Sequence, residues 1–401
     1  MTRKVWGDRV VDRVGTSGAT LAAMMVAATA MAADFPNPLP IEASGASNSL
    51  PATYPANWVF LDYIASPGLT DSKVELLDPG ARSAKQVIGQ VGATYYANFL
   101  QGAARPELYV AETFFSRGTR GARTDVITIY DTRTLTAGAE IVLPGAKRWV
   151  GELQLNAFQF ADHEKLGLVY NFTPASSVTV VDLVTRKVLG QVPLPGCALI
   201  YPTGPRGFSS LCANGTMLSV QLDNAGAVAS QTETARFDDL ADDPLFSAPA
   251  VIGSTSYFIS YKGRVRPVDL SAAAPKLESP WSLVSDDEAK ADWRPSGSQL
   301  AAAGADGRLY VIMQPNGKDG SHLDGGSEVW VFDTASHTKV ATIRLKSMAQ
   351  CIAVGAGDHP LLLATTLGAT LDAYDLATGA LESQALIPSQ GAQTLIYPVR
   401  R

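Results

Sequence analysis

The stretch VITIYDTRTLTAGAEIVLPG, residues 126–145, holds two runs in which apolar and polar residues alternate, joined by a short polar segment that begins at Asp131. Alternation with a period of two buries one face of a β-strand. Asp followed by polar residues and Gly favours a tight turn, because its carboxylate accepts hydrogen bonds from backbone N–H groups. The stretch therefore predicts an antiparallel hairpin, in which Asp131 is a turn residue and not a catalytic acid.

The same pattern recurs, so that the chain holds seven such hairpins. Their turn aspartates lie 41 to 64 residues apart and are Asp78, Asp131, Asp182, Asp223, Asp269, Asp333 and Asp375. Units of this length with three or four strands each are typical of β-propellers, whereas immunoglobulin-like modules need about 100 residues. We therefore expect an all-β fold, a seven-bladed β-propeller with four-stranded antiparallel blades.

The two ends of the repeat region predict how the propeller closes. TLIYPV at 394–399 follows the last hairpin, and NWVFLDYI at 57–64 precedes the first. We expect these two runs to pair in one blade, within a single propeller domain that spans 51–401. Residues 34–50 are rich in Pro, Ser and Asn, and are predicted to form an extended N-terminal arm.

The longest interval between hairpins contains two polar segments. SDDEAKADWRPSG at 285–297 predicts a short helix with Ser285 or Asp286 as its cap. NGKDGSHLDGGS at 316–327 predicts a long polar loop. Its oxygen ligands also suit Ca²⁺, but their spacing differs from that of known calcium loops.

Residues 1–33 have the features of a cleavable secretory signal. Four basic residues precede the apolar stretch GATLAAMMVAATAMAA at 18–33, which ends in an A-x-A pattern. A membrane anchor is the alternative, but the stretch is short and alanine-rich for a spanning helix. No other segment approaches a spanning length, so we expect export to the periplasm and no membrane span in the mature protein.

Composition excludes one class of partner. The 401 residues are 46% hydrophobic and 17% charged, with 35 Gly and 24 Pro, which suits many strands and turns. Without residues 1–33, the 32 basic and 38 acidic residues fall to 28 and 36, a net charge of −8. A nucleic-acid partner is therefore not expected, since such partners select basic surfaces.

The chain has three cysteines, Cys197, Cys212 and Cys351. In an exported protein a disulfide between Cys197 and Cys212 would close a short loop, for a stabilisation of about 3 kcal/mol. Cys351 lies in the apolar run MAQCIAVG and is predicted to be a buried free thiol. None of the cysteine spacings resembles a zinc site.

Residues with catalytic spacing are absent from the sequence. None of the four histidines pairs at ligand spacing with another His, Cys or carboxylate; they are His163, His322, His337 and His359. The sequence has no G-x-S-x-G elbow and no catalytic Cys-His signature. We therefore expect no catalytic, cofactor-binding or metal site in this chain, and a self-sufficient hydrolase is disfavoured.

Five long segments carry a resemblance to a known family. They are SRGTRGARTDVITIYD at 116–131, GCALIYPTGPRGFSSLCANGTMLSVQL at 196–222, DDPLFSAP at 242–249, PWSLVSDDEAKADWRPSG at 280–297 and YVIMQPNGKDGSHLDGGSEVWVFDT at 310–334. With these segments the chain resembles the heavy (large) subunit of the tryptophan tryptophylquinone amine dehydrogenases. DDPLFSAP, PWSLVSDDEAKADW and NGKDGSH look more like aralkylamine (aromatic amine) dehydrogenase than like methylamine dehydrogenase, whose heavy chain is the alternative.

The resemblance implies a function for the whole assembly. In the family, the tryptophan tryptophylquinone belongs to a small light subunit, so no redox cofactor is expected in this chain. Two heavy and two light subunits assemble in the periplasm, a primary amine becomes an aldehyde and ammonia, and electrons pass to a blue copper protein. The resemblance also implies that Cys197 and Cys212 are joined. A diverged, non-enzymatic periplasmic scaffold propeller is the alternative from another class.

Two loops are candidates for functional contacts. In the family, a heavy-chain aromatic residue after the first strand lines the substrate channel, but here the match places Ser66, Pro67 and Gly68 at that point. We expect a wider channel, or one closed by Leu69, that admits bulky amines. The second loop, SRGTRGARTD, does not recur in the other hairpins. Its arginines are predicted to contact the partner subunit, against the alternative of a solvated loop tip; they are Arg117, Arg120 and Arg123.

Overall fold

The computed structural model describes most of the chain, namely residues 49–64, 70, 72–81, 85–387 and 394–400. These residues belong to one compact unit, Asn48–Arg401. The predicted signal peptide, and all but the last two residues of the predicted arm, lie outside the described ranges. Within those ranges the structure has no helix with the length and apolar character needed to cross a membrane.

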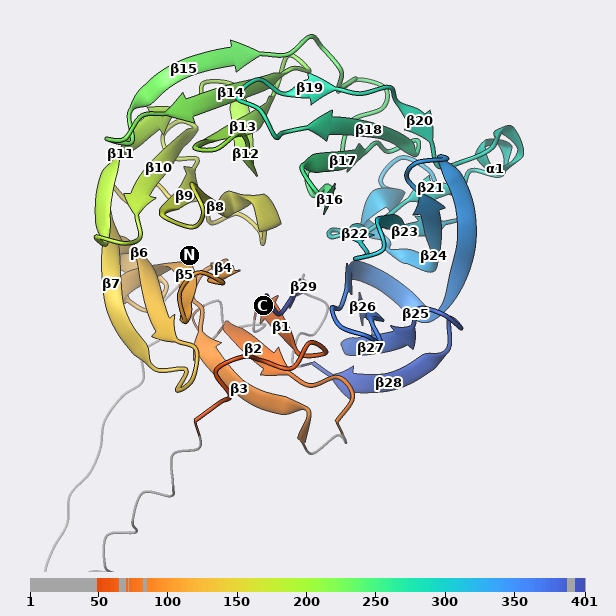
Figure 1. Cartoon of the computed structure of the whole chain (residues 1–401), viewed down its shortest axis with the longest axis horizontal. Helices are drawn as coiled ribbons and strands as arrows, with labels where there is room; N and C mark the ends of the chain where they lie inside the picture. The colour runs from red at the N-terminus through yellow and green to blue at the C-terminus, as the bar shows by residue number, and fades with distance from the viewer. Residues whose placement is uncertain (1–48, 65–69, 71, 82–84, 388–393, 401) are drawn as a thin grey trace, which may run out of the picture. The chain divides into compact units, whose positions relative to one another are not determined.

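The described strands form antiparallel sheets arranged around a common centre, the arrangement of a β-propeller (Figure 1). Five sheets are separate blades of four or five strands. Four of these blades are β29–β1–β2–β3 (Thr394–Pro398, Val59–Tyr63, Lys73–Leu77, Val87–Gly92), β4–β7 (Asn98–Gln101, Glu107–Arg117, Arg120–Asp131, Ala137–Leu143), β8–β11 (Phe158–Ala161, Leu166–Asn171, Ser177–Asp182, Lys187–Pro193) and β12–β15 (Cys197–Pro202, Gly207–Cys212, Met217–Leu222, Val228–Glu233). The fifth is β16–β20 (Ala250–Ile252, Thr255–Ile259, Arg264–Asp269, Lys276–Leu277, Trp281–Ser282).

The remaining strands form one continuous sheet of eight, so the prediction of seven separate blades is wrong. Its strands are β21 (Arg294–Pro295), β22 (Ala301–Ala303), β23 (Arg308–Gln314), β24 (Gly326–Asp333), β25 (Thr338–Val354), β26 (Leu361–Thr366), β27 (Thr370–Asp375) and β28 (Leu381–Leu386). The physical reason is β25, which runs for 17 residues without a break. Its first part pairs with β24 and its last part with β26, so hydrogen bonds continue through the whole sheet.

All seven predicted hairpins are present, each as an antiparallel strand pair. Turn chemistry explains their aspartates. The Asp131 carboxylate accepts hydrogen bonds from the backbone N–H groups of Arg133 and Thr134, both at 2.9 Å. These bonds, that of Thr134 first, lower the pKa of Asp131 below its ordinary value. The interpretation of Asp131 as a turn residue is therefore confirmed.

The two ends of the described chain share one blade, as predicted. β29 pairs antiparallel with β1, in a register that places Val59 opposite Pro398 and Tyr63 opposite Thr394. β1 in turn pairs with β2. Because the last strand joins the first blade, backbone pairing closes the circle of sheets.

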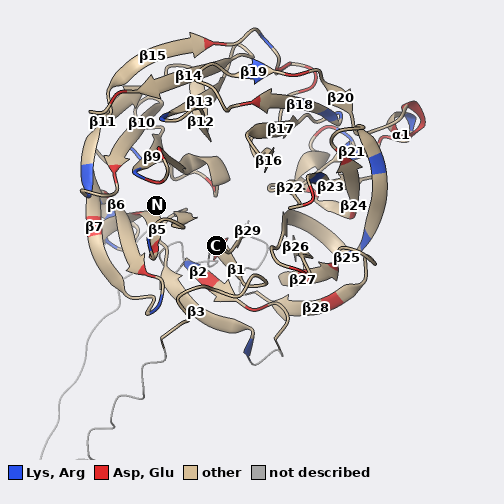
Figure 2. Cartoon of the chain, viewed as in Figure 1, with Lys and Arg blue, Asp and Glu red and all other residues tan. Residues whose placement is uncertain are grey.

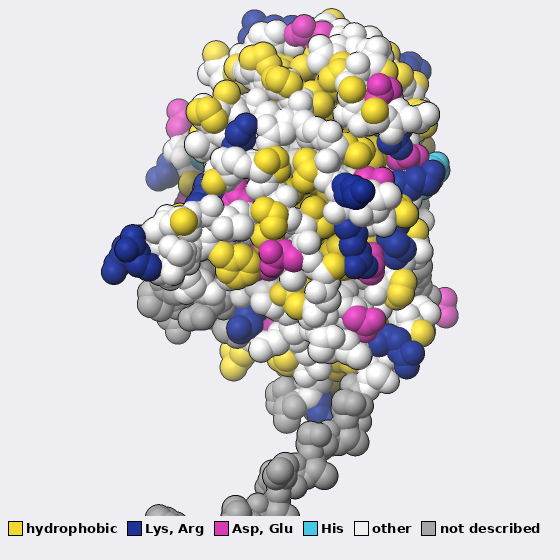
Figure 3. All heavy atoms as spheres, turned by 90° about the vertical axis from the view of Figure 1, so that its left-hand side faces the viewer, with side chains coloured by type: hydrophobic (Ala, Val, Ile, Leu, Met, Phe, Trp, Pro, Cys, Tyr) yellow, Lys and Arg dark blue, Asp and Glu magenta, His cyan; other side chains and the backbone are white. Residues whose placement is uncertain are grey.

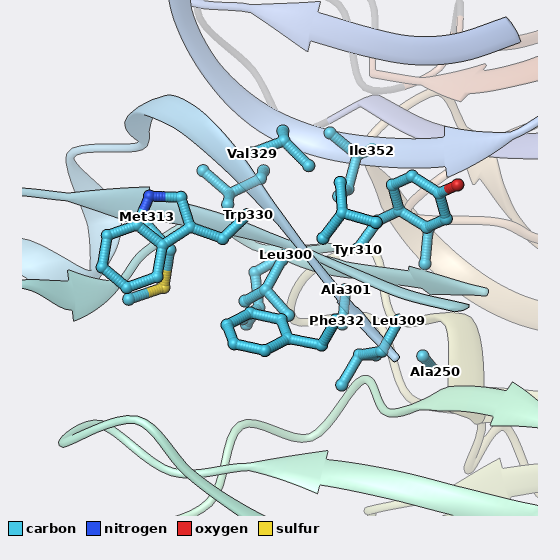
Figure 4. Close-up of a cluster of buried hydrophobic side chains, with 14 of the residues drawn as sticks. Ala250, Leu300, Ala301, Leu309, Tyr310, Met313, Val329, Trp330, Phe332 and Ile352 are labelled. Atoms are coloured by element: carbon cyan, nitrogen blue, oxygen red, sulfur yellow. The ribbon is translucent and has the colours of Figure 1, made fainter. Parts of the chain in front are cut away.

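The core consists of apolar side chains that fill the spaces between neighbouring sheets. The largest cluster lies between β16–β18 and the eight-stranded sheet, and Trp330 and Phe332 of β24 are among its buried members (Figure 4). Leu309 and Val311 contribute from β23, and Ala250 from β16. Side chains of both faces of each sheet are thus buried, which explains the long apolar runs in the sequence.

The predicted helix forms as α1, Asp286–Lys290. Ser285 is its N-cap and forms a capping box with Glu288, in which each side chain bonds the backbone N–H of the other residue. The ribbon of α1, coloured largely as acidic, projects from the circle of sheets (Figure 2). From the side, hydrophobic side chains on the outer strands are scattered among charged and uncharged ones (Figure 3).

Candidate functional site

The alternation of strand direction gives the propeller two different faces. The innermost strands β4, β8, β12 and β16 all begin on one side, which we call the start face. Since consecutive strands are antiparallel, the links between the second and third strands of each blade also lie there. The seven aspartate turns join the third and fourth strands, and so lie on the opposite side, the turn face. The arginine loop between β5 and β6 belongs to the start face.

The types of exposed apolar side chain differ between the start face and the turn face. In the described part of the chain, every exposed Phe, Leu and Met lies at a strand end or link of the start face; they are Phe114, Phe172, Leu240, Leu323, Met348, Leu367 and Leu386. The other large exposed apolar side chains of that part are valines. Phe, Leu and Met side chains exposed on one face are candidates for contacts with another protein.

A cavity of about 250 Å³ lies among the links of the start face. It is lined by segments that connect strands of several sheets. The lining residues are Glu152, Leu153, Gln154, Leu155, Leu245, Phe246, Ser247, Ala248, Tyr261, Gly297, Ser298, His322, Leu323 and Leu395. We call it the axial cavity, because Leu395 belongs to β29, the innermost strand of the first blade. Its volume suits a single amino-acid side chain or a small organic ligand.

One wall of the axial cavity is aromatic. The ring centroids of Phe246 and Tyr261 are 4.7 Å apart, and those of Tyr261 and His322 are 4.6 Å apart with an angle of 30° between the planes. Burial raises the pKa of the Tyr261 hydroxyl above its ordinary value. The imidazole Nδ1 of His322 is buried and has no hydrogen-bond partner in the described residues. This wall is therefore mainly aromatic.

Local hydrogen bonds hold Phe246 and Tyr261 side by side. The Phe246 N–H donates to the carbonyl of Ile259 at 2.8 Å, and the Tyr261 N–H donates to the carbonyl of Pro244 at 3.0 Å. The buried Asp243 carboxylate accepts two hydrogen bonds, one from the Ser260 hydroxyl at 2.8 Å and one from the Lys262 backbone N–H at 2.7 Å. The segment DDPLF is thereby fixed along the turn that follows β17.

His322 lies in the 3-10 turn η4, Ser321–Leu323. The side chains of Ser296 and Gln314 donate to the carbonyl of Ser321 at 2.9 and 2.6 Å, and the N–H of Gly297 donates to the carbonyl of His322 at 2.9 Å. The segment predicted to be a polar loop therefore has a fixed conformation, with its histidine packed against Tyr261. Among the described residues, no group of His, Cys, Asp and Glu suits a metal ion.

A second wall of the axial cavity is polar. The Gln154 side chain accepts a hydrogen bond from the Ser247 hydroxyl at 3.1 Å and donates one to the Glu152 carboxylate at 2.6 Å. The Asn98 side chain donates to the backbone carbonyl of Gln154 at 3.1 Å. Glu152 is exposed and forms no ion pair within the described part of the chain. Its carboxylate is thus a negative charge held at the cavity without a cation.

A buried arginine supports the adjoining part of the start face. The guanidinium of Arg148 donates to the backbone carbonyls of Tyr95 and Tyr96 at 2.7 and 2.8 Å, and to the Thr113 hydroxyl at 2.8 Å. Burial lowers the pKa of Arg148 to about 10, although nearby Asp125 opposes that shift. Arg148 remains cationic at neutral pH and fixes the backbone of the two tyrosines.

Asp62 is the least satisfied polar side chain near this network. It lies on β1, is 1% exposed, and neither carboxylate oxygen has a hydrogen-bond partner in the described residues. Burial raises its pKa well above the ordinary value, and Arg148 only partly opposes the effect. A buried carboxyl group without partners favours the neutral acid.

The three arginines of the predicted contact loop have different environments. Arg117 and Arg120 are exposed at the tip between β5 and β6. Arg123 forms two hydrogen bonds with the buried carboxylate of Asp125, at 2.8 and 3.0 Å, and a third with the carbonyl of Arg148 at 2.6 Å. Arg123 is therefore part of the fold, and only Arg117 and Arg120 are free to meet a partner.

The cysteines have the states inferred from the sequence. A disulfide joins Cys197 of β12 to Cys212 of β13, with their Cα atoms 3.9 Å apart. Cys351 is a buried free thiol, and burial raises its pKa to about 11. A thiol of this kind is unreactive at neutral pH.

The predicted channel loop lies outside the described residues. Its members are Ser66, Pro67, Gly68 and Leu69. The strand ends that flank this loop, Tyr63 of β1 and Lys73 of β2, are paired with each other. These ends belong to the second and third strands of their blade, and so lie on the start face.

The axial cavity was missed at the sequence level. Phe246 and His322 lie in DDPLFSAP and NGKDGSH, two stretches that carry the family resemblance, whereas Tyr261 and Glu152 lie outside the segments that carry it. The four residues are far apart in sequence, and only the circular order of the sheets brings them together. Segment similarity was the one available clue.

Comparison with known proteins identifies relatives of the chain. The family model described as "Methylamine dehydrogenase heavy chain (MADH)" matches residues 72–388. The chain belongs to the methylamine dehydrogenase heavy chain family. The methylamine dehydrogenase heavy chain of Paracoccus versutus is 30% identical over 274 residues, 67% of this chain and 63% of the relative. That of Methylophilus methylotrophus is 27% identical over 369 residues, 90% of each chain.

Solved structures with much lower identity support the fold of this family member. A dihydro-haem d1 dehydrogenase is 15% identical, with a TM-score of 0.52 over 86% of this chain and 76% of that chain. A candidate 6-phosphogluconolactonase from Bacteroides fragilis is 11% identical, with a TM-score of 0.56 over 89% and 99%. At such identities the similarity concerns the propeller architecture alone.

Proposed function

We propose that this chain is the heavy subunit of an amine dehydrogenase and that it docks a small light subunit on its start face. The observation that carries the proposal is the collection of exposed Phe, Leu and Met side chains on that face, in a chain of the methylamine dehydrogenase heavy chain family. Obligate interfaces are more apolar than ordinary protein surfaces. In the described part of the chain the exposed apolar side chains of the turn face are valines, such as Val184 and Val251, and not Phe, Leu or Met.

In the proposed assembly the light subunit contains the tryptophan tryptophylquinone. With water, this group would convert a primary amine to an aldehyde and ammonia, taking up two electrons that leave singly to a blue copper protein. The heavy chain would cover the reacting centre and exclude bulk water, which strengthens the electrostatic interactions within a site. The proposal includes two heavy and two light subunits, assembled in the periplasm after removal of residues 1–33.

We further propose that the preferred amine is aromatic. The support is the similarity of DDPLFSAP and NGKDGSH to aralkylamine dehydrogenase, together with the aromatic residues that these segments contribute to the axial cavity. Methylamine, the substrate in the names of the curated relatives, is the alternative. Comparing kcat/KM for phenylethylamine, tyramine and methylamine decides between them, and a preference for methylamine contradicts the aromatic proposal.

The main proposal is tested by isolating the chain from its native host during growth on an amine. We expect a small, cysteine-rich subunit with quinone absorbance to co-purify, and the complex to reduce a dye only when an amine is added. A heavy chain that is stable, colourless and alone under these conditions contradicts the proposal. That result supports a non-enzymatic propeller scaffold instead.

A further inference from the structure

The axial cavity combines two features that together recognise an organic cation. Three rings pack together on one wall, those of Phe246, Tyr261 and His322. The Glu152 carboxylate stands on another wall, and its one hydrogen bond in the described residues comes from Gln154. An ammonium or guanidinium group is attracted both to aromatic π-faces and to a carboxylate.

The chain already uses this combination elsewhere to hold a lysine. The Nζ atom of Lys339 lies 3.5 Å from the ring centroid of Trp330 and forms an ion pair with Glu288. That arrangement is complete, because its cation comes from the same chain. At the axial cavity the aromatic wall and the carboxylate are present, but no Lys or Arg lines it in the described part of the chain.

We infer that the axial cavity receives a Lys or Arg side chain of the light subunit when that subunit docks on the start face. The inference rests on the proposed function and names one contact within it. Leu323, which lines the cavity, is 62% exposed and belongs to the apolar surface that docking would cover. Covering Glu152 without a cation would leave a buried, unpaired charge, which is costly. A cationic side chain at this point removes that cost.

The position of the cavity indicates that the cation comes from the light subunit. The cavity volume of about 250 Å³ accommodates a long side chain, and the exposed carboxylate is directly beside the apolar surface. A side chain that arrives with its own subunit is fixed by the rest of the interface, so it binds without the entropy cost of a free ligand. A free amine in the same cavity is an alternative that the experiment separates.

The test measures the dissociation constant of the reconstituted heavy–light complex for three heavy-chain variants. Glu152→Gln removes the charge but keeps an oxygen for the Gln154 hydrogen bond, and Tyr261→Leu removes the π-face. Glu140→Gln is the matched control, because Glu140 is exposed on the outer strand β7, away from the cavity. Because a hydrogen bond to a charged group contributes about 1.5–3 kcal/mol, we expect Glu152→Gln to weaken binding about 10- to 100-fold. Tyr261→Leu should weaken it about 3- to 30-fold, and Glu140→Gln less than twofold.

Three results overturn the inference. If wild type binds the light subunit and Glu152→Gln binds equally well, the cavity contact is wrong while the proposed function stands. If the wild-type chain binds no light subunit, both fail. If butylammonium binds the isolated heavy chain in a Glu152-dependent manner, while Glu152→Gln leaves assembly unchanged, the occupant is a free amine. Circular dichroism and thermal melting of each variant show that any loss of binding is not loss of fold.

Discussion

Arg148 donates a hydrogen bond of 2.7 Å from its buried guanidinium to the backbone carbonyl of Tyr95. Tyr95 and the following Tyr96 both have positive φ, 52° and 50°, in the left-handed region that side chains other than Gly rarely adopt. Such residues cost about 1–3 kcal/mol each and persist where the surrounding structure holds them. The Tyr95 ring packs on Phe115 with centroids 4.9 Å apart, so Arg148 connects this strained turn to the arginine hairpin.

Replacing Arg148 with Met should release the Tyr95–Tyr96 turn. Removal of the buried cation leaves the two carbonyls without their donor and nearby carboxylates without its positive charge, and we expect a loss of about 3–5 kcal/mol in the free energy of unfolding. Urea denaturation measures the loss, and hydrogen exchange should show faster opening at residues 93–97 than at the remote strand β14. Unchanged exchange at this turn would show that Arg148 does not hold it.

Asp62→Asn should change how stability depends on pH. The folded-state pKa of Asp62 is raised, so the native chain binds its proton more tightly than the unfolded chain does. Its favourable contribution is therefore fully present below the unfolded pKa of about 4 and is lost as the pH rises towards the folded-state value. We expect the variant to match wild type near pH 4 and to be more stable by about 1–3 kcal/mol at pH 8. Thermal melts across this range measure the difference; a constant difference would show that Asp62 does not titrate as described.

Substitutions at Arg123 and at Arg120 of the β5–β6 hairpin should have different effects, the first on stability and the second on assembly with the light subunit. Arg123→Glu places a carboxylate against the buried Asp125, and we expect destabilisation of about 3 kcal/mol or more in chemical denaturation. Arg120→Glu lies at the exposed tip and should leave the unfolding midpoint unchanged while it weakens light-subunit binding. Equal binding by wild type and Arg120→Glu would identify the tip as a solvated loop.

Substitutions on the two faces should show which of them docks the light subunit. Leu323→Asp and Leu367→Asp place charges on the start face, and we expect either to weaken assembly at least tenfold, because a desolvated charge opposes docking. Val184→Asp is the matched control, since Val184 is 59% exposed beside the Asp182 turn on the turn face. Analytical ultracentrifugation of the mixed subunits measures the effect. Loss of assembly only in Val184→Asp would place the interface on the turn face.

Reduction of the disulfide should lower the stability of the blade β12–β15. The bridge spans 15 residues and constrains the unfolded chain, so its loss should cost about 3 kcal/mol. Urea unfolding with and without dithiothreitol measures the change. Cys351→Ser is the control, because Cys351 forms no disulfide and its variant should remain sensitive to the reductant. A reductant effect that persists in Cys197→Ala/Cys212→Ala would contradict this account.

The local pattern of the sequence determined the hairpins, the all-β class and the α1 cap. These features depend on neighbouring residues, on the period of two and on the hydrogen-bonding capacity of Asp and Ser. The same pattern could not determine the number of separate sheets. TKVATIRLKSMAQCIAV alternates without a breaker, and whether it forms one strand or two depends on which strands its parts meet.

Only the tertiary structure decided where the functional surface lies. Glu152, Phe246, Tyr261 and His322 are separated by up to 170 residues, and they meet because consecutive blades place their links on the same side of the propeller. The same is true of Arg123, which the sequence grouped with Arg117 but the fold pairs with Asp125. The sequence determined which segments become strands and turns, since that choice is local. The packing of distant segments decided which side chains remain free to meet a partner, since burial and pairing depend on contacts across the whole molecule.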